Sequence, residues 1–483
     1  MARFTIFTVV ALAGCAPLTY EAATPAWVND TSTLQPKTPT PIADTYREVA
    51  ATIIKTARSD RGAYAKLSEL TDKVGNRLAG SAALDKAIDW ATKTLAADRI
   101  TVKTEKVMVP HWTRGTEAAA VMSPVSHDLR LLALGGSVAT PKPGLTAPVV
   151  VVHDWAELDA KAEQVKGAIV VYNVPMPAYS EQEGSGYGKT VAYRTQGASR
   201  AAKKGAVAAL VRSVTAHSLG TPHTGAMHYD DDAPKIPTAA IAVEDAELID
   251  RLATKGPVTI WLRLDTATYP DAESANVIGE LKGSTNPDEV VVIGAHLDSW
   301  DVGQGAHDDG AGVVTMMQAL QTLAKLGLHP RRTIRVVLFT NEENGLRGGK
   351  TYAEVHAKEL PSTVFALEAD SGGFPPRGFT VSHKDEAAAT RMRGRLADIT
   401  SLLHELGAMT IRQGGGGADI SPMGPAGVPQ AGLEVDGRTY FDYHHTEADT
   451  LDKVKPQDLS DMVAAIAVVA YVVADMPDRV DAP

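Results

Sequence analysis

The feature that most constrains the fold is an alternation of apolar strands and helices in the second half of the chain. Apolar runs of strand length at 289–294, 332–340 and 363–368 alternate with helical patterns such as 312–326. Such alternation favours an α/β fold, a mostly parallel mixed sheet flanked by helices on both faces. In sheets of this kind, ligands bind beyond the carboxyl ends of the strands. We therefore look for a functional site at that edge.

The pattern changes between residues 118 and 266, where short β-branched runs are separated by Gly and Pro. We expect an inserted strand-rich domain there, between two parts of the main domain at 43–117 and 267–478. An insert that leaves and re-enters the main domain lies close to it. We therefore expect the insert to cover the cleft at the carboxyl ends of the strands and to favour short substrates.

The N-terminus predicts export, because a basic start precedes an apolar run too short to cross a bilayer as a helix. The run ends at Cys15, the only Cys, in a box that resembles the bacterial lipoprotein cleavage site. Residues 1–14 then form the signal, Cys15 carries the lipid, and the Thr/Pro-rich segment 15–42 is a linker. The alternative is an ordinary signal cleaved near Ala22 or Ala23. The predicted location is the periplasm or cell envelope as a lipoprotein, or otherwise outside the cell.

The composition of the chain limits the classes of molecule that it is expected to bind. The chain has 47 Lys and Arg against 58 Asp and Glu, a formal charge of -11. This balance disfavours nucleic acid and an anionic membrane surface, so membrane contact is expected only through the lipid anchor. The chain contains neither a Gly-x-Ser-x-Gly nucleophile motif nor a Cys nucleophile in its mature part. A peptide or small-molecule substrate fits these properties better.

Residue types that bind metals follow the predicted strands. Because parallel strand ends meet at one edge, these side chains are expected around one cleft. Imidazole and carboxylate without thiolate suit zinc, and the set is large enough for two ions, a bridging carboxylate and a separate general base. The candidates are His296 and Asp298; Glu342 and Glu343; Glu368 and Asp370; His307, Asp308 and Asp309, which open a helix; and His444, His445, Glu447 and Asp449.

Three segments carry a family resemblance: GAHLDSWDVGQGAHDDG at 294–310, NEENG at 341–345 and YHHT at 443–446. Together they resemble the co-catalytic di-zinc exopeptidases, a family that includes bacterial aminopeptidases and glutamate carboxypeptidases. The branch that looks most similar is that of carboxypeptidase Q. The resemblance extends over roughly residues 43–476. It implies two zinc ions, held by Asp308 as the bridge, His296 and Asp370 on one ion, and Glu343 and His445 on the other.

The resemblance also implies roles for residues around the metals. Glu342 would be the general base, and the Asp298 carboxylate would accept the N–H of His296 and fix its tautomer. His307 departs from the family, where a smaller or apolar residue is usual, and its position before the bridge suggests that it points elsewhere. Arg347 is a candidate for binding a substrate carboxylate, but an exposed Arg at a helix start is an equally good interpretation.

The resemblance further identifies the insert as a protease-associated domain that partly covers the active site, and it suggests a homodimer. The expected activity is hydrolysis of dipeptides or short peptides as a carboxypeptidase or dipeptidase. An aminopeptidase acting on longer peptides is the alternative. Two other classes on this fold stay open: a glutaminyl cyclase with one zinc, and a binding module that has lost its metal ligands. The number of zinc ions per chain separates them.

Overall fold

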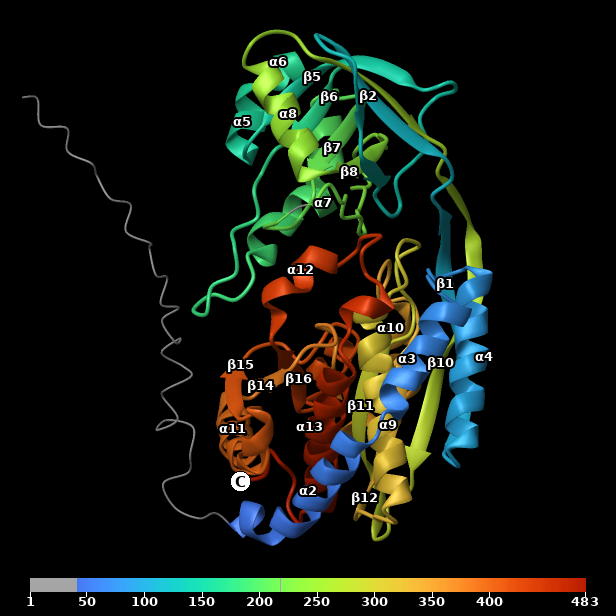
Figure 1. The fold of residues 1–483 in the computed structure, drawn as a ribbon, viewed down its shortest axis with the longest axis vertical. Coiled ribbons are helices and arrows are strands. Elements are labelled where there is room, and N and C mark those ends of the chain that lie inside the picture. Colours follow the sequence, from blue (N-terminus) through green and yellow to red (C-terminus); the bar gives the residue numbers. More distant parts are fainter. Residues whose placement is uncertain (1–40, 218) are drawn as a thin grey trace, which may run out of the picture.

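The computed structural model describes residues 41–217 and 219–483. Two α/β units, each built around its own sheet, lie one above the other (Figure 1). The lower unit combines the N-terminal helices with the C-terminal half of the chain, and the upper unit is formed by the segment between them. The mixed α/β fold predicted from the sequence is confirmed. The Cys15 and signal predictions lie outside the described residues.

The lower sheet has the strand order β1-β10-β12-β11-β13-β16-β14-β15. Its four central strands are parallel to one another, as the alternation predicted, whereas β10 pairs antiparallel with β12, and β14 antiparallel with β16. The bounds of all strands in the lower sheet are β1 Thr101–Thr113, β10 Ala267–Leu281, β11 Asn286–His296, β12 Arg332–Phe339, β13 Thr363–Glu368, β14 Pro376–Ser382, β15 Thr410–Gln413 and β16 Gln430–Val435.

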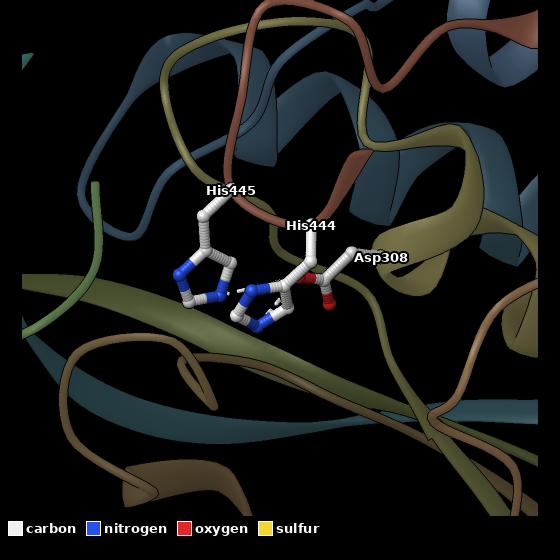
Figure 2. A group of neighbouring side chains, drawn as sticks. All are labelled: Asp308, His444 and His445. Atoms are coloured by element: carbon white, nitrogen blue, oxygen red, sulfur yellow. Dashed lines mark ion pairs between the residues drawn. The ribbon is translucent and has the colours of Figure 1, made fainter. Parts of the chain in front are cut away.

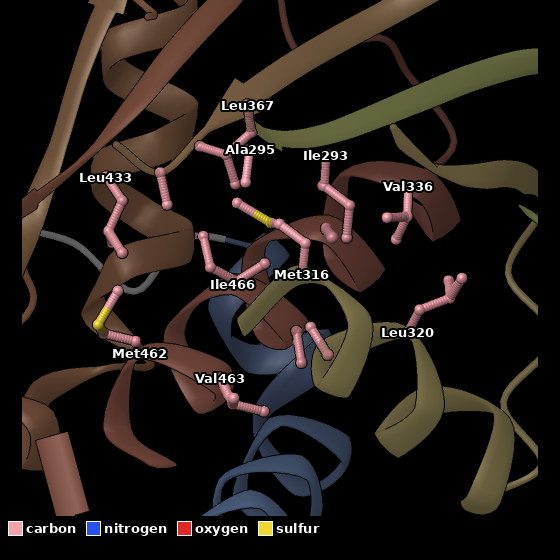
Figure 3. Close-up of a cluster of buried hydrophobic side chains, with 14 of the residues drawn as sticks. Ile293, Ala295, Met316, Leu320, Val336, Leu367, Leu433, Met462, Val463 and Ile466 are labelled. Atoms are coloured by element: carbon pink, nitrogen blue, oxygen red, sulfur yellow. The ribbon is translucent and has the colours of Figure 1, made fainter. Parts of the chain in front are cut away.

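Helices cover the two faces of this sheet unequally. One face carries the large core, where side chains such as Met316, Ile293 and Ile466 meet between sheet and helices (Figure 3). The other face carries a smaller core around Phe339 and Tyr352. The first face packs against α4 Ala82–Ala97, α9 Ala311–Lys325, α11 Glu386–Ser401 and α13 Pro456–Asp475, and α2 Pro41–Ser59 and α3 Gly62–Lys73 pack on α9 and α13; the second face packs against α10 Arg347–Val355.

Helix α13 is the one helix in the described part of the chain that is long and apolar enough to cross a membrane. Most of it is buried, and it packs against α2 and α9. A helix that is apolar all round is expected in the core of a large α/β unit. We therefore interpret α13 as a core helix.

The upper unit contains a second sheet with the order β3-β2-β9-β5-β6-β7-β8-β4. It joins the lower unit through the long antiparallel ribbon of β1 and β10. Its elements are β2 Glu117–Ser123, β3 His127–Leu129, β4 Leu131–Ala133, β5 Leu145–Val152, β6 Ile169–Tyr172, β7 Ala208–Arg212, β8 Thr238–Ile241 and β9 Thr259–Leu264, with α5 Trp155–Ala160, α6 Ala162–Val165, α7 Tyr187–Ala202 and α8 Val243–Ala253.

The two units share a packed contact at Trp300. This residue belongs to the loop that follows β11 in the lower unit, yet its side chain is 2% exposed and lies in the hydrophobic core of the upper unit. A Cβ on Gly135 would lie 2.0 Å from Trp300 Cη2, so only glycine leaves room for the indole. Beside it, Arg114 of the upper unit holds Asp301 through Nε at 2.9 Å and Nη2 at 2.5 Å. The upper unit is therefore fixed to the loop after β11.

We predict that Trp300→Ala destabilises the protein by about 3–5 kcal/mol, the usual cost of truncating a buried Trp. Gly135→Ala should also destabilise it, because the added methyl group overlaps the indole. Calorimetric unfolding temperatures of both variants test this, with Trp90→Ala on the half-buried surface of α4 as the matched control. Equal shifts in unfolding temperature for Trp300→Ala and Trp90→Ala would show that the contact of Trp300 with the upper unit adds no more stability than a half-buried contact on the surface.

Candidate metal centre

The candidate ligands converge because they follow neighbouring strand ends. His296 ends β11, Glu343 lies just beyond β12, and Asp370 lies just beyond β13. Asp308 stands before α9, and His445 follows the short helix α12, Tyr440–Tyr443. The structure thus brings all five residues proposed as ligands into one site. All are buried except Asp370, which is half-buried.

Asp308 lies at the middle of this site. Its Oδ1 is 3.2 Å from Nε2 of His296, and its Oδ2 is 3.2 Å from Nε2 of His445. Figure 2 shows Asp308 beside His445 and His444, whose rings stack with centroids 3.5 Å apart. Each carboxylate oxygen therefore faces a different imidazole, which is the arrangement a bridging carboxylate needs.

The outer carboxylates complete two groups of donors. Nε2 of His296 lies 3.5 Å from Oδ1 of Asp370, and Nε2 of His445 lies 3.1 Å from Oε2 of Glu343. Two donors bonded to one tetrahedral zinc at about 2.0–2.2 Å are about 3.3 Å apart. Oδ2 of Asp308 and Oε1 of Glu343 are also buried with no hydrogen-bond partner in the described chain. The donor set and its spacing fit zinc.

The site is rich in buried carboxyl groups, so it requires positive charge. Burial lowers the pKa of His445, but Glu343 and Asp308 outweigh this and raise it to about 10. Burial and then the charge of Asp308 raise the pKa of Glu343 to about 7. The buried carboxyl groups here are Asp298, Asp308, Asp309, Glu343, Glu368, Asp419 and Asp449. Cations at the centre would relieve the repulsion among them.

Glu342 sits beside the ligands without pairing with a histidine. It lines a cavity together with these ligands, and burial raises its pKa well above its usual value, with the charges of Asp370 and Glu343 adding to this and His296 opposing it. Its backbone N–H donates to Oδ1 of Asp298 at 2.9 Å, which fixes the turn after β12. Glu342 is thus placed to exchange a proton with a ligand in the cavity.

Asp298 differs from the expectation in its contacts. Nδ1 of His296 is 3.1 Å from the backbone carbonyl of Asp298 and 3.7 Å from its carboxylate, so the carbonyl is the nearer acceptor. The carboxylate instead accepts the backbone N–H groups of Glu342 and Glu343, at 2.9 and 3.4 Å. The amides at the turn draw the carboxylate away from the imidazole. Asp298 still fixes the His296 tautomer, but through its main chain.

His307 points away from the ligands. Its Nδ1 accepts the N–H of Gly373 at 3.0 Å, and its ring stacks on Phe374 and Tyr443 with centroids 4.4 and 5.5 Å away. Burial lowers the pKa of His307 to about 4. A neutral imidazole packed between aromatic rings supports the loop before α9, as its position in the sequence suggested.

The role of Arg77 in holding the site together was missed in the sequence, whereas Asp449 was among the candidates but its contact with the backbone of Asp308 was not predicted. Arg77, fully buried, donates to the carbonyl groups of Leu297, Gln304 and Gly305 at 2.6, 2.9 and 3.0 Å, so it binds both ends of the loop that carries Trp300. Asp449 accepts the N–H of Asp308 at 3.1 Å. A buried Arg in a Gly-rich loop was the available signal, because burial of a guanidinium requires acceptors.

The upper unit also reaches the centre. The N–H of Thr224 donates to the carbonyl of His445 at 3.0 Å, and Nδ1 of His445 lies 3.2 Å from the carbonyl of Thr224. This exchange holds His445 in a left-handed backbone conformation, with φ 62°, and leaves its Nε2 facing Asp308. A ligand of the lower unit is thus oriented by the backbone of the upper unit.

Two adjoining cavities open on the site. The first, of about 400 Å³, is lined by Asp308, Glu342, Glu343, Asp370 and His445 together with Ser185, Tyr187 and Arg194 of the upper unit. The second, of about 320 Å³, shares Ser185 and Asp370 with it and extends along Gly415, Gly416 and Gly417.

Arg347 lines neither cavity, and its guanidinium lies 3.9 Å from Asp271. The interpretation of Arg347 as a surface residue therefore fits better.

Known proteins are similar to this chain in sequence and in fold. The profile of peptidase family M28 matches residues 276–470. Carboxypeptidase Q of Mus musculus is 43% identical over 438 residues, covering 90% of this chain and 90% of that protein. Carboxypeptidase Q of Homo sapiens is 42% identical over 436 residues, covering 89% of this chain and 90% of that protein.

Solved structures with a similar fold belong to the same kinds of protein. The crystal structure of a peptidase M28 precursor from Shewanella amazonensis has a TM-score of 0.85 at 40% identity, covering 90% of this chain and 98% of that one. A zinc aminopeptidase from Bacillus subtilis has a TM-score of 0.64 at 20% identity, covering 87% and 96%, and shares the fold. On this evidence the chain belongs to peptidase family M28, in which it is similar to carboxypeptidase Q.

Proposed function

We propose that the chain is an exported exopeptidase that binds two zinc ions and hydrolyses peptide bonds in dipeptides or short peptides. Membership of peptidase family M28, with carboxypeptidase and zinc-aminopeptidase relatives, supports zinc-dependent exopeptidase chemistry. The single observation that carries the two-ion site is Asp308, whose oxygens each lie 3.2 Å from a different histidine. The upper unit would be a protease-associated domain that restricts the cleft to short substrates.

Each residue of the centre has a role in this proposal. Asp308 would bridge the ions, with His296 and Asp370 on one side and Glu343 and His445 on the other. Bound zinc supplies a water that loses its proton near neutral pH and positive charge beside the carbonyl oxygen. Hydrogen bonds of the backbone keep the ligands in place. The N–H of Glu343 donates to Asp298 and the N–H of His296 donates to Asp309, while the carbonyl of His445 accepts the N–H of Thr224.

Glu342 would be the general base. Its carboxylate lines the cavity together with the candidate ligands, where it would be within the buried centre that holds the reacting groups. It would take the proton of the attacking water and then donate it to the nitrogen of the leaving amine. Because it lines the same cavity as the ligands, one carboxylate can serve both steps.

We predict that purified protein contains about two zinc ions per chain, measured by plasma mass spectrometry. One ion per chain would favour a cyclase, and none a binding module. Asp308→Ala should lose both ions, since one carboxylate serves both, whereas exposed Asp288→Ala should keep them. Two ions retained in Asp308→Ala would place the bridge elsewhere.

We predict that Glu342→Gln keeps both zinc ions and the unfolding temperature but lowers kcat about 1,000-fold, because the amide keeps the shape and loses proton transfer. The matched control is Glu354→Gln on the exposed surface of α10, which should behave as wild type. Steady-state hydrolysis of an unblocked dipeptide provides the measurement. Turnover within a few-fold of wild type in Glu342→Gln would refute the assignment of the base.

The N-terminal prediction concerns residues outside the described part of the structure. Expressed in a bacterium with its signal, the protein should partition into detergent and carry diacylglycerol on Cys15, as seen in the mass of its N-terminal peptide. Cys15→Ser should abolish processing at this site. A wild-type mature N-terminus beyond Cys15, for example near Ala22, would show an ordinary secretory signal instead.

A further inference from the structure

Two buried polar atoms beside the metal centre have complementary needs. Nε1 of Trp300 is an N–H donor and Oε1 of Glu343 is an acceptor, and neither has a hydrogen-bond partner within residues 41–217 and 219–483. The other carboxylate oxygen of Glu343, Oε2, faces Nε2 of His445 at 3.1 Å and so lies on the metal side. An unpaired donor or acceptor in the interior is costly. One small molecule that both accepts and donates a hydrogen bond would satisfy the two atoms together.

Trp300 and Glu343 line the same small cavity, the third at this centre. Its volume is about 10 Å³, and its walls also include Asp308, His445 and Asp449. A buried water needs about 10–15 Å³ of space together with two to four polar partners. The cavity therefore has the size of one water molecule, and its walls offer an indole N–H as donor and carboxylate oxygens as acceptors.

The indole of Trp300 is fixed where it meets this cavity. The residue is 2% exposed and packs in the hydrophobic core of the upper unit, with its ring 5.6 Å from that of His445. A Cβ on Gly135 would lie 2.0 Å from Cη2, at the far end of the indole, so the ring has little room to turn. Packing against the upper unit therefore sets the direction of the N–H.

We propose that this cavity binds one water molecule, which accepts the N–H of Trp300 and donates to Oε1 of Glu343. Trp300 is then a positioning residue. Through the water it fixes the rotation of the Glu343 carboxylate, so that Oε2 stays directed at the metal side. Hydrogen-bond partners of this kind orient metal-binding side chains and influence metal affinity. The inference rests on the metal site of the proposed function and is independent of which peptide is hydrolysed.

The proposal links the packing of the upper unit to both ligands of one ion. The backbone of Thr224 in the upper unit orients His445 by exchanging hydrogen bonds with it. Trp300, whose side chain lies in the core of the upper unit, orients Glu343 through the water. Metal affinity on the side of Glu343 and His445 therefore depends on how the two units pack together.

The first test is a high-resolution crystal structure of the wild-type protein, grown once without metal and once with zinc. In both crystals, density for one water should lie within about 3.2 Å of both Nε1 of Trp300 and Oε1 of Glu343. No density, density that contacts only one of these atoms, or a direct bond between them would overturn the proposal. Because the water contacts only the chain, the metal-free crystal still decides the inference if wild type binds no zinc and the proposed function fails.

The second test separates positioning from packing. Trp300→Phe keeps much of the ring packing and removes the N–H. The matched control is Trp112→Phe, since Trp112 is 4% exposed in the same core and its indole N–H donates to the carbonyl of Ser137 at 3.0 Å. Competition with a chelator measures zinc affinity. Trp300→Phe should weaken binding of the ion on the Glu343 side about 10-fold, and Trp112→Phe should leave it within about twofold of wild type.

The unfolding temperatures of the two metal-free variants, measured in parallel, should fall by similar amounts, because each loses a buried indole. A loss of zinc affinity confined to Trp300→Phe is then not explained by lower stability. Equal zinc affinities in the two variants would assign Trp300 to packing alone and overturn its positioning role. If Trp300→Phe does not fold, the wild-type crystals decide the proposal.

Discussion

The carboxylate of Asp308 is buried with each of its oxygens facing a different imidazole, and much of the molecule serves to hold it there. A carboxylate in the interior, surrounded by further carboxyl groups, is tolerable only where positive charge is close. The parallel strands supply the convergence, because β11, β12 and β13 end at the same edge and deliver His296, Glu343 and Asp370. Asp449 and Arg77 then fix the loop between β11 and α9 from behind.

The upper unit is part of this centre as well as a cover over it. Its backbone at Thr224 orients His445, its Arg194 lines the cavity, and its core receives Trp300 from the loop after β11. A displacement of the upper unit would therefore disturb a metal ligand directly. The proposed restriction to short substrates would also depend on these contacts, because they hold the upper unit over the cavity.

The sequence predicted the parts of the fold that periodicity encodes. Three of the central strands and α9 were found because they are apolar or amphipathic over their whole length, and the metal-binding residue types follow strand ends. Strands β1, β10, β14 and β15 were missed because their exposed faces carry polar residues. Arg194 and Thr224 reach His445 through tertiary contacts, which no local pattern records.

The most direct test of the central claim is a crystal grown with zinc and measured above and below the zinc absorption edge. Two anomalous peaks should flank the Asp308 carboxylate, about 3.5–4 Å apart. One peak should lie against His296 and Asp370, and the other against His445 and Glu343. A single peak, or two peaks that do not share Asp308, would contradict the account of Asp308 as the bridge on which the site depends.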